Sequence, residues 1–421
     1  MKTAGIIAEY NPFHKGHEYQ IKYTRERLKA DYVIVAMSGD YVQRGTPALI
    51  SKHARAEMAL RCGADLVLEM PVSVSTASAE AFAMGGVSLL DGLGVVDMLC
   101  FGSESGEISA LKELAEILVE EPEEYKKLLK SFLSEGLTFP AARSQALTEY
   151  FKNPRNFNGD DFDGVLTPLL NEVTQILNTP NNILGIEYCK AILEQETPMT
   201  PVPLPRVGAG HGQALAESGH AQFASASALR ALWAEQGADA LTPYVPEKAL
   251  ELYKKAEIDG MYTDHAAAGR CELALLRAAC ARPEPFAAVR GVSEGLDHRL
   301  ENAVRSCTGL PQLLDALTTV RYPRARMRRL AMDAALGYTA DTVPALPPYL
   351  HLLGARREAL VLLKHASLPL SHSLAKLEKE NDACARIAAA QAGASDFGAL
   401  CRRVPGPMGG VYRQKIIFLT N

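Results

Sequence analysis

The chain has 421 residues, of which 48% are hydrophobic and 22% are charged, and its formal net charge is −5. These values are typical of a globular protein, and the length favours two domains over a single hydrophobic core. No apolar run reaches the ~18 residues of a membrane span, the N-terminal run is too short for a signal peptide, and the eight cysteines include no C-x-x-C pair. We therefore expect a cytoplasmic protein with free thiols, no zinc site and no disulfide framework.

The first predicted element is a strand followed by a turn and a helix, in the stretch AGIIAEYNPFHKGH at residues 4–17. Its apolar start predicts a buried strand, the Asn-Pro pair predicts a turn, and the next helix extends to about residue 29. A helix N-terminus offers unpaired N–H groups, and Gly16 has no Cβ to obstruct a nucleotide. Two imidazoles there can donate to phosphate oxygens, so we predict a phosphate site with His14 and His17 as catalytic residues. The alternative is a pair of surface histidines after a turn.

Three further apolar runs alternate with helical segments over the first hundred residues. This alternation predicts a parallel, doubly wound α/β sheet. The polar loop at residues 38–45 follows the second strand, at the edge where open α/β sheets bind ligands. The predicted strands are residues 32–37, 65–71 and 97–101, and the predicted helices are about residues 51–62 and 75–91.

A helical pattern occupies about residues 107–150 and is a candidate cap over the sheet. Residues 151–167 are polar, rich in Asn, Asp and Gly, and aperiodic, which indicates an exposed loop. Their aspartates suggest calcium, but the spacing does not match an EF-hand loop, and we prefer a solvated loop. We therefore predict a helical insertion at about residues 107–175.

Two adjacent asparagines occur in the stretch NTPNNILGIEY at residues 178–188. Thr179 or Asn181 can cap a helix that runs to about residue 195. Exposed amides before a helix also suit recognition of ribose or a base. Capping explains one asparagine more easily than two, so Asn181 and Asn182 are candidate nucleotide contacts.

Two cationic side chains follow, each at the end of a predicted element. Residues 199–205 contain three prolines and read as an edge strand. The strand leads into a glycine-rich stretch in which Arg206 can clamp a phosphate. The sequence SASALR at residues 225–230 predicts a helix with Ser225 at its N-cap and Arg230 one turn further on, a second anion site. Any amphipathic helix can begin in this way, so this second site depends on the histidine motif for support.

The sequence beyond residue 245 is rich in Ala and Leu and has a helical period. We predict an ATP-binding domain at residues 1–245 and a mainly helical, basic domain at residues 246–421. Residues 251–421 carry 23 Lys and Arg against 17 Asp and Glu, a net charge of +6, which leaves −11 for the first 250 residues. A basic half on an acidic chain indicates a local site for a polyanion.

The most unusual stretch in this half is RYPRARMRR at residues 321–329, with five arginines in nine residues. Arginines so close together repel one another unless a polyanion or carboxylates lie nearby. We favour contact with an RNA backbone and stacking of the tyrosine; the alternative is a surface helix whose arginines pair with glutamates. The predicted RNA contacts are Arg321, Tyr322, Arg324, Arg326, Arg328 and Arg329.

Together these motifs resemble one family, the bacterial tRNA(Met) cytidine acetate ligases of the HxGH nucleotidyltransferase superfamily. The resemblance implies a doubly wound α/β fold with the nucleotide over the first strand. It also implies activation of acetate by ATP to acetyl-adenylate, followed by acetyl transfer to N4 of the wobble cytidine of elongator tRNA(Met). The matching stretches, which span most of the chain in order, are GIIAEYNPFHKGH, SGDYVQRGTPA, KHARAEMALRCGADLVLEMP, CFGSESG, PNNILGIEY, PLPRVGAGH, SASALR, SEGLDHRL and RYPRARMRRL.

In such an enzyme acetate itself attacks the α-phosphate, and Mg²⁺ accompanies ATP without a metal site on the protein. His14 and His17 would serve the α- and β-phosphates, and Arg206 and Arg230 the β/γ end. Neither DNA nor a membrane is an expected partner. The residues implied for the ATP site are Ile7, Ala8, Glu9, Tyr10, Asn11, Pro12, Phe13, His14, Lys15, Gly16, His17, Glu18, Tyr19, Gln20, Gly102, Asn181 or Asn182, and Arg206, to which the second anion site adds Ser225 and Arg230.

Two other functions are compatible with parts of the sequence. The first is a nucleotidyltransferase in which a phosphorylated small metabolite attacks the nucleotide, which acetate-dependent exchange of pyrophosphate into ATP would distinguish. The second is a non-catalytic RNA-binding factor that uses a nucleotide site as a switch. The intact H-x-G-H and SASALR motifs argue against this factor, because degeneration should reach the phosphate contacts first.

Overall fold

The computed structural model describes residues 1–153, 156, 173–205, 224–293, 295–340 and 346–420. Within these ranges eight strands form one mixed sheet in the order β10-β8-β5-β2-β1-β6-β7, with β9 paired to β8. Every pair is parallel except β5 with β8. The strands are β1 (Thr3–Ala8), β2 (Tyr32–Ser38), β5 (Leu66–Met70), β6 (Met98–Ser103), β7 (Thr200–Pro205), β8 (Leu350–Arg356), β9 (Leu370–Ser371) and β10 (Ile417–Leu419).

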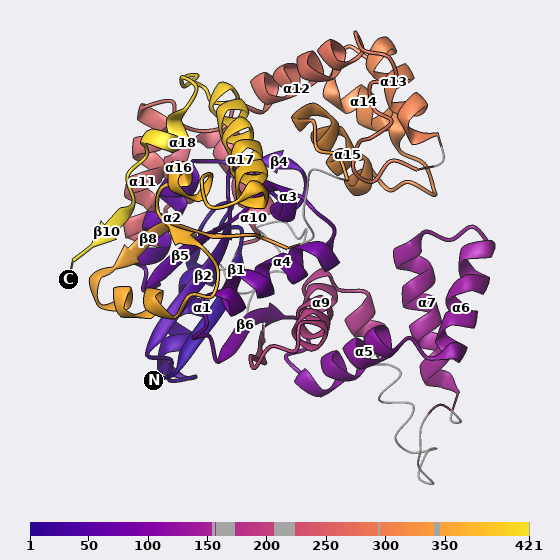
Figure 1. Cartoon of the computed structure of the whole chain (residues 1–421), viewed down its shortest axis with the longest axis horizontal. Helices are drawn as coiled ribbons and strands as arrows, with labels where there is room; N and C mark the ends of the chain where they lie inside the picture. Colours follow the sequence, from indigo (N-terminus) through magenta and orange to yellow (C-terminus); the bar gives the residue numbers. More distant parts are fainter. Residues whose placement is uncertain (154–155, 157–172, 206–223, 294, 341–345, 421) are drawn as a thin grey trace.

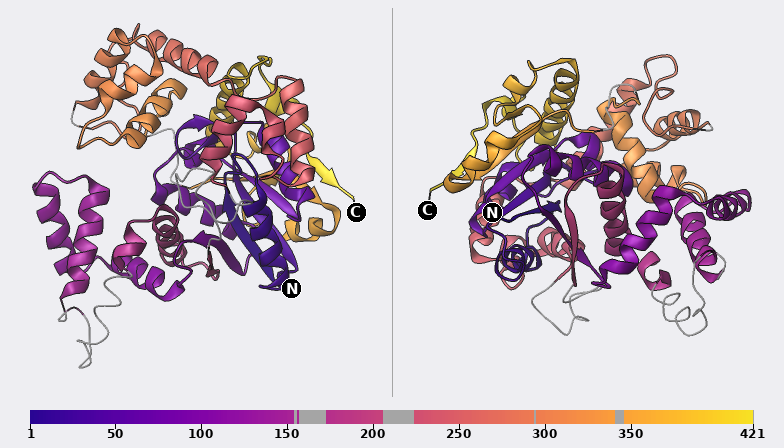
Figure 2. Two further views of the ribbon diagram at one scale, coloured as in Figure 1. Left: turned by 180° about the vertical axis from the view of Figure 1, so that it is seen from behind. Right: turned by 60° about the horizontal axis from the view of Figure 1, so that its bottom comes forward.

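Helices cover both faces of the sheet, as Figures 1 and 2 show. Successive side chains of a strand point to opposite faces, so Ile6 and Ile7 of β1 enter two different core clusters. This arrangement confirms the predicted α/β class and the strand–helix alternation of the first hundred residues. The helices on the face of Ile6 are α1 (Lys15–Glu26), α2 (Lys52–Arg61), α10 (Ala226–Gln236) and α11 (Glu247–Ile258), and those on the face of Ile7 are α4 (Ala79–Gly92), α5 (Ile108–Glu120) and α9 (Pro180–Glu194).

Two glycines allow α4 to lie close to the first strand. A Cβ at Gly5 would lie 2.6 Å from a methyl carbon of Leu90, and one at Gly86 would lie 2.7 Å from a methyl carbon of Ile7. Leu90 and Ile7 are both buried, so their methyl groups cannot move aside to make room for a Cβ. The glycines therefore fix the helix-to-strand distance that sets the position of the end of β1.

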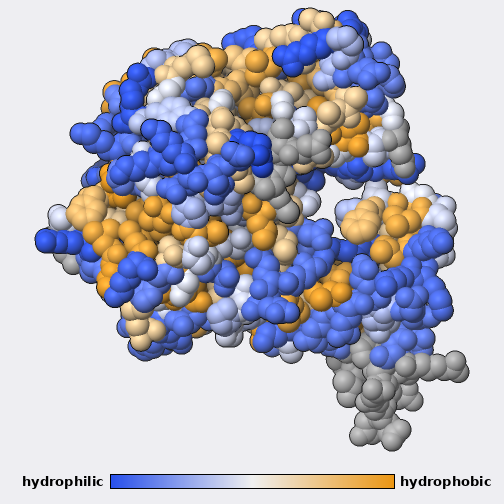
Figure 3. All heavy atoms as spheres, viewed as in Figure 1, coloured by the Kyte–Doolittle hydropathy of each residue, from blue (hydrophilic) through white to orange (hydrophobic). Residues whose placement is uncertain are grey.

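The helices α6 (Glu123–Ser134) and α7 (Phe139–Lys152) form a hairpin that projects from the sheet (Figure 1). Its base joins the main core through buried side chains such as Tyr125 and Phe151. Its tip carries the exposed side chains Leu133 and Phe139, and Figure 3 shows apolar surface there on the side that faces α13 to α15.

A second helical lobe has its own hydrophobic core. Leu276, Leu300, Leu314 and Met327 meet in it, one from each of four helices. These helices are α12 (His265–Ala279), α13 (Leu296–Ser306), α14 (Leu310–Leu317) and α15 (Arg324–Leu336). Further helical segments in the described ranges are α3 (Val72–Ser75), η3 (Ala238–Leu241), η4 (Arg357–His365), α16 (Leu374–Leu377), α17 (Asp382–Leu400) and α18 (Gly410–Arg413).

The chain returns to the sheet after this lobe, which the sequence did not predict. β8 pairs with β5 in antiparallel register, Leu66 opposite Ala355, and β10 adds in parallel beyond β8. The sheet therefore takes strands from both sides of the predicted boundary at residue 245. The division into two domains remains a prediction. The lobe of α12 to α15, which has its own hydrophobic core, is the part of the structure most separate from the sheet.

Buried charges attach α17 and β8 to the C-terminal edge of the sheet. Lys52 Nζ lies 2.7 Å from Glu69 Oε1 and 3.1 Å from Asp40 Oδ2. The second carboxylate oxygen of Glu69 lies 2.5 Å from His351 Nδ1 on β8, and Gln391 of α17 donates to Glu69 Oε1 at 2.7 Å. These groups satisfy one another away from solvent, so the C-terminal elements are fixed in relation to the loop after β2.

All eight cysteines are free, as predicted. Of the helices in the described ranges, none combines the length and the apolar character that crossing a bilayer requires.

Candidate active site

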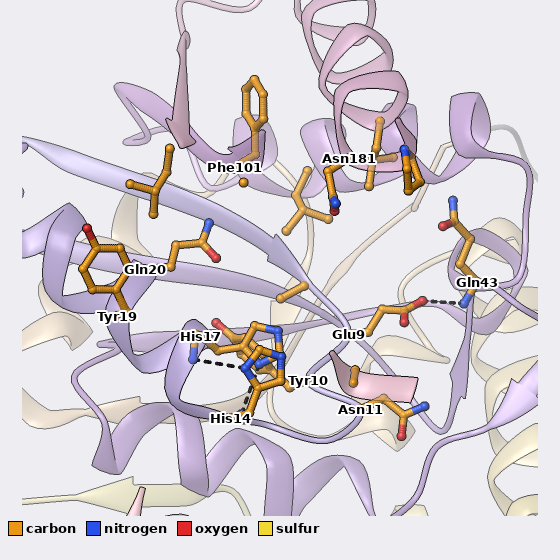
Figure 4. Close-up of a pocket in the computed structure, with 18 of the residues that line it drawn as sticks. Glu9, Tyr10, Asn11, His14, His17, Tyr19, Gln20, Gln43, Phe101 and Asn181 are labelled. Carbon is orange, nitrogen blue, oxygen red and sulfur yellow. Dashed lines mark hydrogen bonds between the residues drawn. The ribbon is translucent and has the colours of Figure 1, made fainter. Parts of the chain in front are cut away.

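A pocket of about 360 Å³ opens at the C-terminal edge of the sheet, beside the ends of β1 and β6 and the N-termini of α1, α9 and α10 (Figure 4). This is the edge at which the sequence predicted a nucleotide. The described residues that line it are Ile7, Ala8, Glu9, Tyr10, Asn11, His14, Gly16, His17, Tyr19, Gln20, Gln43, Arg44, Phe82, Phe101, Gly102, Pro180, Asn181, Leu184, Tyr188, Leu204, Pro205, Ala224 and Ala226.

The two histidines form a reciprocal cap at the start of α1. His14 Nδ1 accepts a hydrogen bond from the Gly16 N–H at 3.1 Å, and His17 Nδ1 accepts one from the His14 N–H at 3.2 Å. The rings are stacked with centroids 3.8 Å apart. Because each Nδ1 acts as an acceptor, the proton of each neutral ring is assigned to Nε2. Each histidine therefore carries a donor on the ring nitrogen that the cap does not use.

Aromatic rings support the histidine turn from beneath. The ring of Tyr10 lies edge-on to His17 with centroids 4.9 Å apart, and Phe13 lies 5.6 Å from the same imidazole. The Phe13 N–H donates to the hydroxyl oxygen of Tyr253 at 2.7 Å, while the Tyr253 hydroxyl lies 3.1 Å from the Phe13 carbonyl. The turn is thereby attached to α11, which the sequence did not indicate. Tyr10 and Phe13 are buried, so the imidazoles cannot tilt away from the pocket.

A carboxylate and a neighbouring loop form one side of the pocket. Glu9 Oε1 accepts a hydrogen bond from the Gln43 N–H at 2.8 Å. Arg55 on α2 is fully buried, and its guanidinium donates to the carbonyls of Glu9 at 2.6 Å, of Ser38 at 3.0 Å and of Gly39. The enclosed position of Glu9 raises the pKa of its carboxyl group, against the opposing effects of the Gln43 N–H and nearby arginines.

The opposite side of the pocket is largely apolar. Phe101 of β6 and Tyr188 of α9 contact each other with ring centroids 5.4 Å apart, and both line the pocket with Leu184. Asn181 projects from the start of α9, and its Nδ2 donates to Glu104 Oε1 at 2.5 Å. Figure 4 places Phe101 and Asn181 together, across the pocket from the histidines. This combination of a ring wall with one amide suits a purine and its ribose.

Asn182 forms hydrogen bonds within the protein, and its contact with the nucleotide stays a prediction. Its side chain is buried, and its Oδ1 accepts from the Ser103 hydroxyl at 2.6 Å and from the Glu104 N–H at 2.8 Å. The predicted side-chain cap of α9 by Thr179 or Asn181 is also absent. The Asn182 N–H instead donates to the Glu104 carboxylate at 2.9 Å. The Asn182 side chain therefore joins the loop after β6 to the start of α9.

Arg230 and Ser225 are not among the residues that line the pocket. Arg230 Nη1 donates to the Asn11 carbonyl at 2.5 Å, and Ser225 accepts from the Ala228 N–H at 3.3 Å as the predicted N-cap. Lys15 donates to the Pro243 carbonyl at 2.7 Å. The predicted ATP contacts of Ser225, Lys15 and Arg230 stay predictions. Pro12, Phe13 and Glu18 are likewise absent from the lining, and Arg206 lies outside the described residues.

The sequence did not single out several lining residues. Gln43 and Arg44 belong to the polar loop flagged after the second strand, so a signal for them existed. The loop forms a hairpin of β3 (Tyr41–Val42) and β4 (Thr46–Pro47). The apolar lining residues Phe82, Phe101, Leu184, Tyr188 and Leu204 carry no such signal, because a core side chain looks the same in sequence.

The arginine-rich stretch divides into exposed and buried side chains. Arg321, Arg324 and Arg326 are exposed, and the Arg326 guanidinium lies 5.2 Å from the centroid of the Tyr322 ring. Arg328 is buried and forms two hydrogen bonds to Glu272, at 2.6 and 2.7 Å. At Arg328 the structure therefore shows pairing with a carboxylate, the alternative named for this stretch, and an RNA contact of this residue stays a prediction.

This stretch touches the pocket loop directly. Gly45 has a φ of +70°, and a Cβ there would lie 3.2 Å from the Arg328 carbonyl oxygen and 3.2 Å from the Arg329 Cα. The hairpin that carries Gln43 and Arg44 thus rests on the main chain of α15. The basic helix and the pocket share this contact.

No group of three or more His, Cys, Asp or Glu residues within the described ranges is arranged to hold a metal ion. Glu9 is the one carboxylate among the described lining residues. An Mg²⁺ ion that enters with ATP would therefore depend on phosphate oxygens and water for most of its ligands.

The chain is similar over most of its length to proteins of one known family. A family model described as HIGH Nucleotidyl Transferase matches residues 1–401. The chain is 35% identical over 405 residues to a protein of Acetivibrio thermocellus named tRNA(Met) cytidine acetate ligase, covering 91% of this chain and 90% of that one. It is 36% identical to a Clostridium perfringens protein of the same name, with 86% and 87% covered.

Solved structures agree with this placement. The Thermotoga maritima TmcAL crystal structure bound with alpha-thio ATP has a TM-score of 0.87 and 31% sequence identity, and 100% of both chains is covered. The apo form of the same protein gives a TM-score of 0.88 and 32% identity, again over 100% of both chains. The chain therefore belongs to the HIGH nucleotidyl transferase family and, within it, to the tRNA(Met) cytidine acetate ligases.

Proposed function

We propose that this protein is an ATP-dependent acetate ligase that forms acetyl-adenylate and acetylates N4 of the wobble cytidine of elongator tRNA(Met). The observation that carries the proposal is the pair of capped imidazoles in a base-sized pocket, in a chain that aligns over 91% of its length with a tRNA(Met) cytidine acetate ligase. ATP is the nucleotide substrate, consistent with the alpha-thio ATP bound by the T. maritima relative.

In the first step the acetate carboxylate attacks the α-phosphate of ATP, and pyrophosphate leaves. No protein nucleophile is needed, so the chain has to position two anions and stabilise the negative charge on the leaving group. His14 and His17 suit this role, because the cap fixes the orientation of both rings through Nδ1 and both rings line the pocket. The adenine would lie against Phe101 and Tyr188, with Asn181 at its edge.

In the second step the wobble cytidine leaves its stack and enters the pocket beside the acetyl-adenylate. The tRNA backbone would contact the exposed cations of the helical lobe, namely Arg321, Arg324 and Arg326, with Tyr322 as a stacking surface. Arg329 is half-buried beside them. The contact between Gly45 and α15 supports this arrangement, because it joins the basic helix to the pocket loop.

The test is incubation of the purified protein with ATP, labelled acetate and total tRNA, with the label scored in nucleosides after digestion. We expect label in N4-acetylcytidine of one tRNA, dependent on ATP, and acetate-dependent exchange of pyrophosphate into ATP. A control without acetate excludes background exchange. Exchange that requires a phosphorylated metabolite in place of acetate would contradict the proposal and favour a nucleotidyltransferase.

A further inference from the structure

The pocket has two polar sides of different chemical character. In Figure 4 the imidazoles of His14 and His17 lie between Tyr19 and Gln20 on one side and Glu9 and Gln43 on the other. The histidine donors suit phosphate oxygens. A carboxylate repels them at short range, so the end of the pocket at Glu9 is poorly suited to the triphosphate. It suits a substrate group that donates hydrogen bonds.

The exocyclic amine of cytosine is such a group. It carries two N–H donors, and carboxylates accept from cytosine N4 in base recognition. Glu9 Oε1 accepts a hydrogen bond from the Gln43 N–H. Glu9 Oε2 accepts none from any described residue, and it is not one of the buried side-chain atoms that lack a hydrogen-bond partner. One carboxylate oxygen of Glu9 is therefore fixed in position and the other is available to a ligand.

We propose that Glu9 is a catalytic residue of the transfer step: it accepts a hydrogen bond from N4 of the wobble cytidine and takes the N4 proton. This assignment rests on the proposed function. N4 attacks the acetyl carbonyl carbon, so that a C–N bond forms while the bond from this carbon to the adenylate oxygen breaks. AMP leaves with the electron pair, and the N4 proton passes to Glu9 Oε2 and then to solvent.

The other lining residues are less suited to this role. Each imidazole uses Nδ1 to accept a main-chain N–H, so the unprotonated nitrogen of the neutral ring is occupied. The remaining described polar groups of the lining are amides, phenols and Arg44, none of which is a base near neutral pH. Arg55 fixes the Glu9 main chain through its carbonyl, which gives the carboxylate the rigid support that a base requires.

The charged and titratable groups that face Glu9 come from three helices and the hairpin loop. They are Arg230 on α10, Arg55 on α2 and Arg44 in the loop, together with the phenol of Tyr188 on α9. The arginines favour the ionised carboxylate, while enclosure favours the neutral acid and raises the pKa. A raised pKa makes the ionised carboxylate a stronger proton acceptor.

Glu9→Gln tests the assignment, because the amide keeps the shape and still accepts from Gln43 but takes no proton. Two rates are measured: acetate-dependent exchange of pyrophosphate into ATP, and transfer from added acetyl-adenylate to tRNA. We expect the ratio of transfer to exchange to fall on the order of 10²-fold, the typical contribution of a general base. Transfer by the unmodified protein should also decline as pH drops through the Glu9 pKa, and the variant should lack this decline.

Two further variants keep the result interpretable. Glu9→Asp retains a carboxylate one methylene shorter and should recover the pH-dependent decline at a lower rate. Glu57→Gln removes a carboxylate from the outer side of α2, where Glu57 pairs with Arg61, and should match the unmodified protein.

The outcomes separate this assignment from the proposed function. Equal losses of exchange and transfer in Glu9→Gln would mean that Glu9 serves ATP or its metal ion, and would overturn the assignment. So would unchanged transfer. An unmodified protein that transfers no acetyl group from acetyl-adenylate would overturn the proposed function itself.

Discussion

The two nitrogens of the His14 ring have different roles. Nδ1 accepts the Gly16 N–H and completes the first turn of α1, whereas Nε2 is the donor that we assign to phosphate oxygens. His17 repeats the arrangement one turn further on by accepting from the main chain of His14. The same two side chains thus build the helix start and equip it for an anion, so their structural and chemical contributions can be tested apart.

His14→Asn and His14→Ala make this separation. Asparagine is a strong N-cap residue but is too short to place a donor where Nε2 lies, and alanine provides neither function. We expect His14→Ala to lower the free energy of unfolding by about 1 kcal/mol and His14→Asn to change it far less. Both should slow acetate-dependent pyrophosphate exchange by on the order of 10²–10³-fold.

Lys22→Ala on the exposed side of α1 is the matched control, since Lys22 pairs only with Glu18 there among the described ion pairs. Urea unfolding and the exchange assay measure the two effects. Normal exchange in His14→Asn would show that the cap, and not the Nε2 donor, is what the reaction requires.

At the level of elements, α15 combines a binding surface with a structural ion pair. Arg326 is exposed, whereas Arg328, two residues on, is buried and bonded twice to Glu272 of α12. We expect Arg326→Ala to weaken tRNA binding and reduce the slope of log affinity against log salt by about 1, as for one lost phosphate contact. The measurement is a binding titration at several salt concentrations.

Arg328→Met should instead lower the free energy of unfolding of the lobe by about 3–5 kcal/mol, because it leaves the Glu272 carboxylate buried without a partner. The double variant Arg328→Met/Glu272→Leu should recover most of this loss, since neither charge then remains. A salt slope that changes in Arg328→Met while stability does not would contradict this division of the helix.

These elements also show how far the sequence could predict the fold. The strand, turn and helix around His14 follow from local signals, namely an apolar run, a proline and a helix start, and the structure confirms each of them. Strand β8 could not be found in this way. Its sequence LHLLGAR has no clear alternation, and its extended form depends on pairing with β5, which lies far away in sequence.

The same limit applies to the candidate site. Most residues of the histidine turn line the pocket, His14 and His17 among them, because one short segment carries both the signal and the geometry. The internal hydrogen bonds of Asn182 and Arg328 could not be predicted, because their partners, Ser103 and Glu272, are remote in sequence. A polar residue that is bonded inside the protein and one that binds a ligand have the same letter, and only the fold distinguishes them.

For the whole molecule, the buried charges around Lys52 link stability to pH. Burial would raise the pKa of Asp40, but Lys52, Ser395 and Arg55 outweigh this effect and lower it from 3.8 to about 2. A carboxyl group with a lowered pKa in the folded state stabilises the fold above its unfolded pKa, and this contribution disappears as pH falls through the folded value. The relevant window is therefore about pH 4 down to about pH 2.

We expect the unmodified protein to lose about 2 kcal/mol of unfolding free energy from this group across that window. Asp40→Asn should be less stable at neutral pH, and its stability should decline less steeply in acid. Urea unfolding at a series of pH values gives both curves. Parallel curves would show that Asp40 does not carry the effect.

The late arrival of β8 in the sheet has a consequence for synthesis on the ribosome. β5 is buried throughout, and one of its edges is paired only by residues 350–356. Until that segment leaves the exit tunnel, the nascent chain presents an apolar strand with open main-chain donors and acceptors, the kind of edge on which chains aggregate. The half of the sheet that carries the histidine turn can assemble early, whereas its far side stays open until residues 350–356 have emerged.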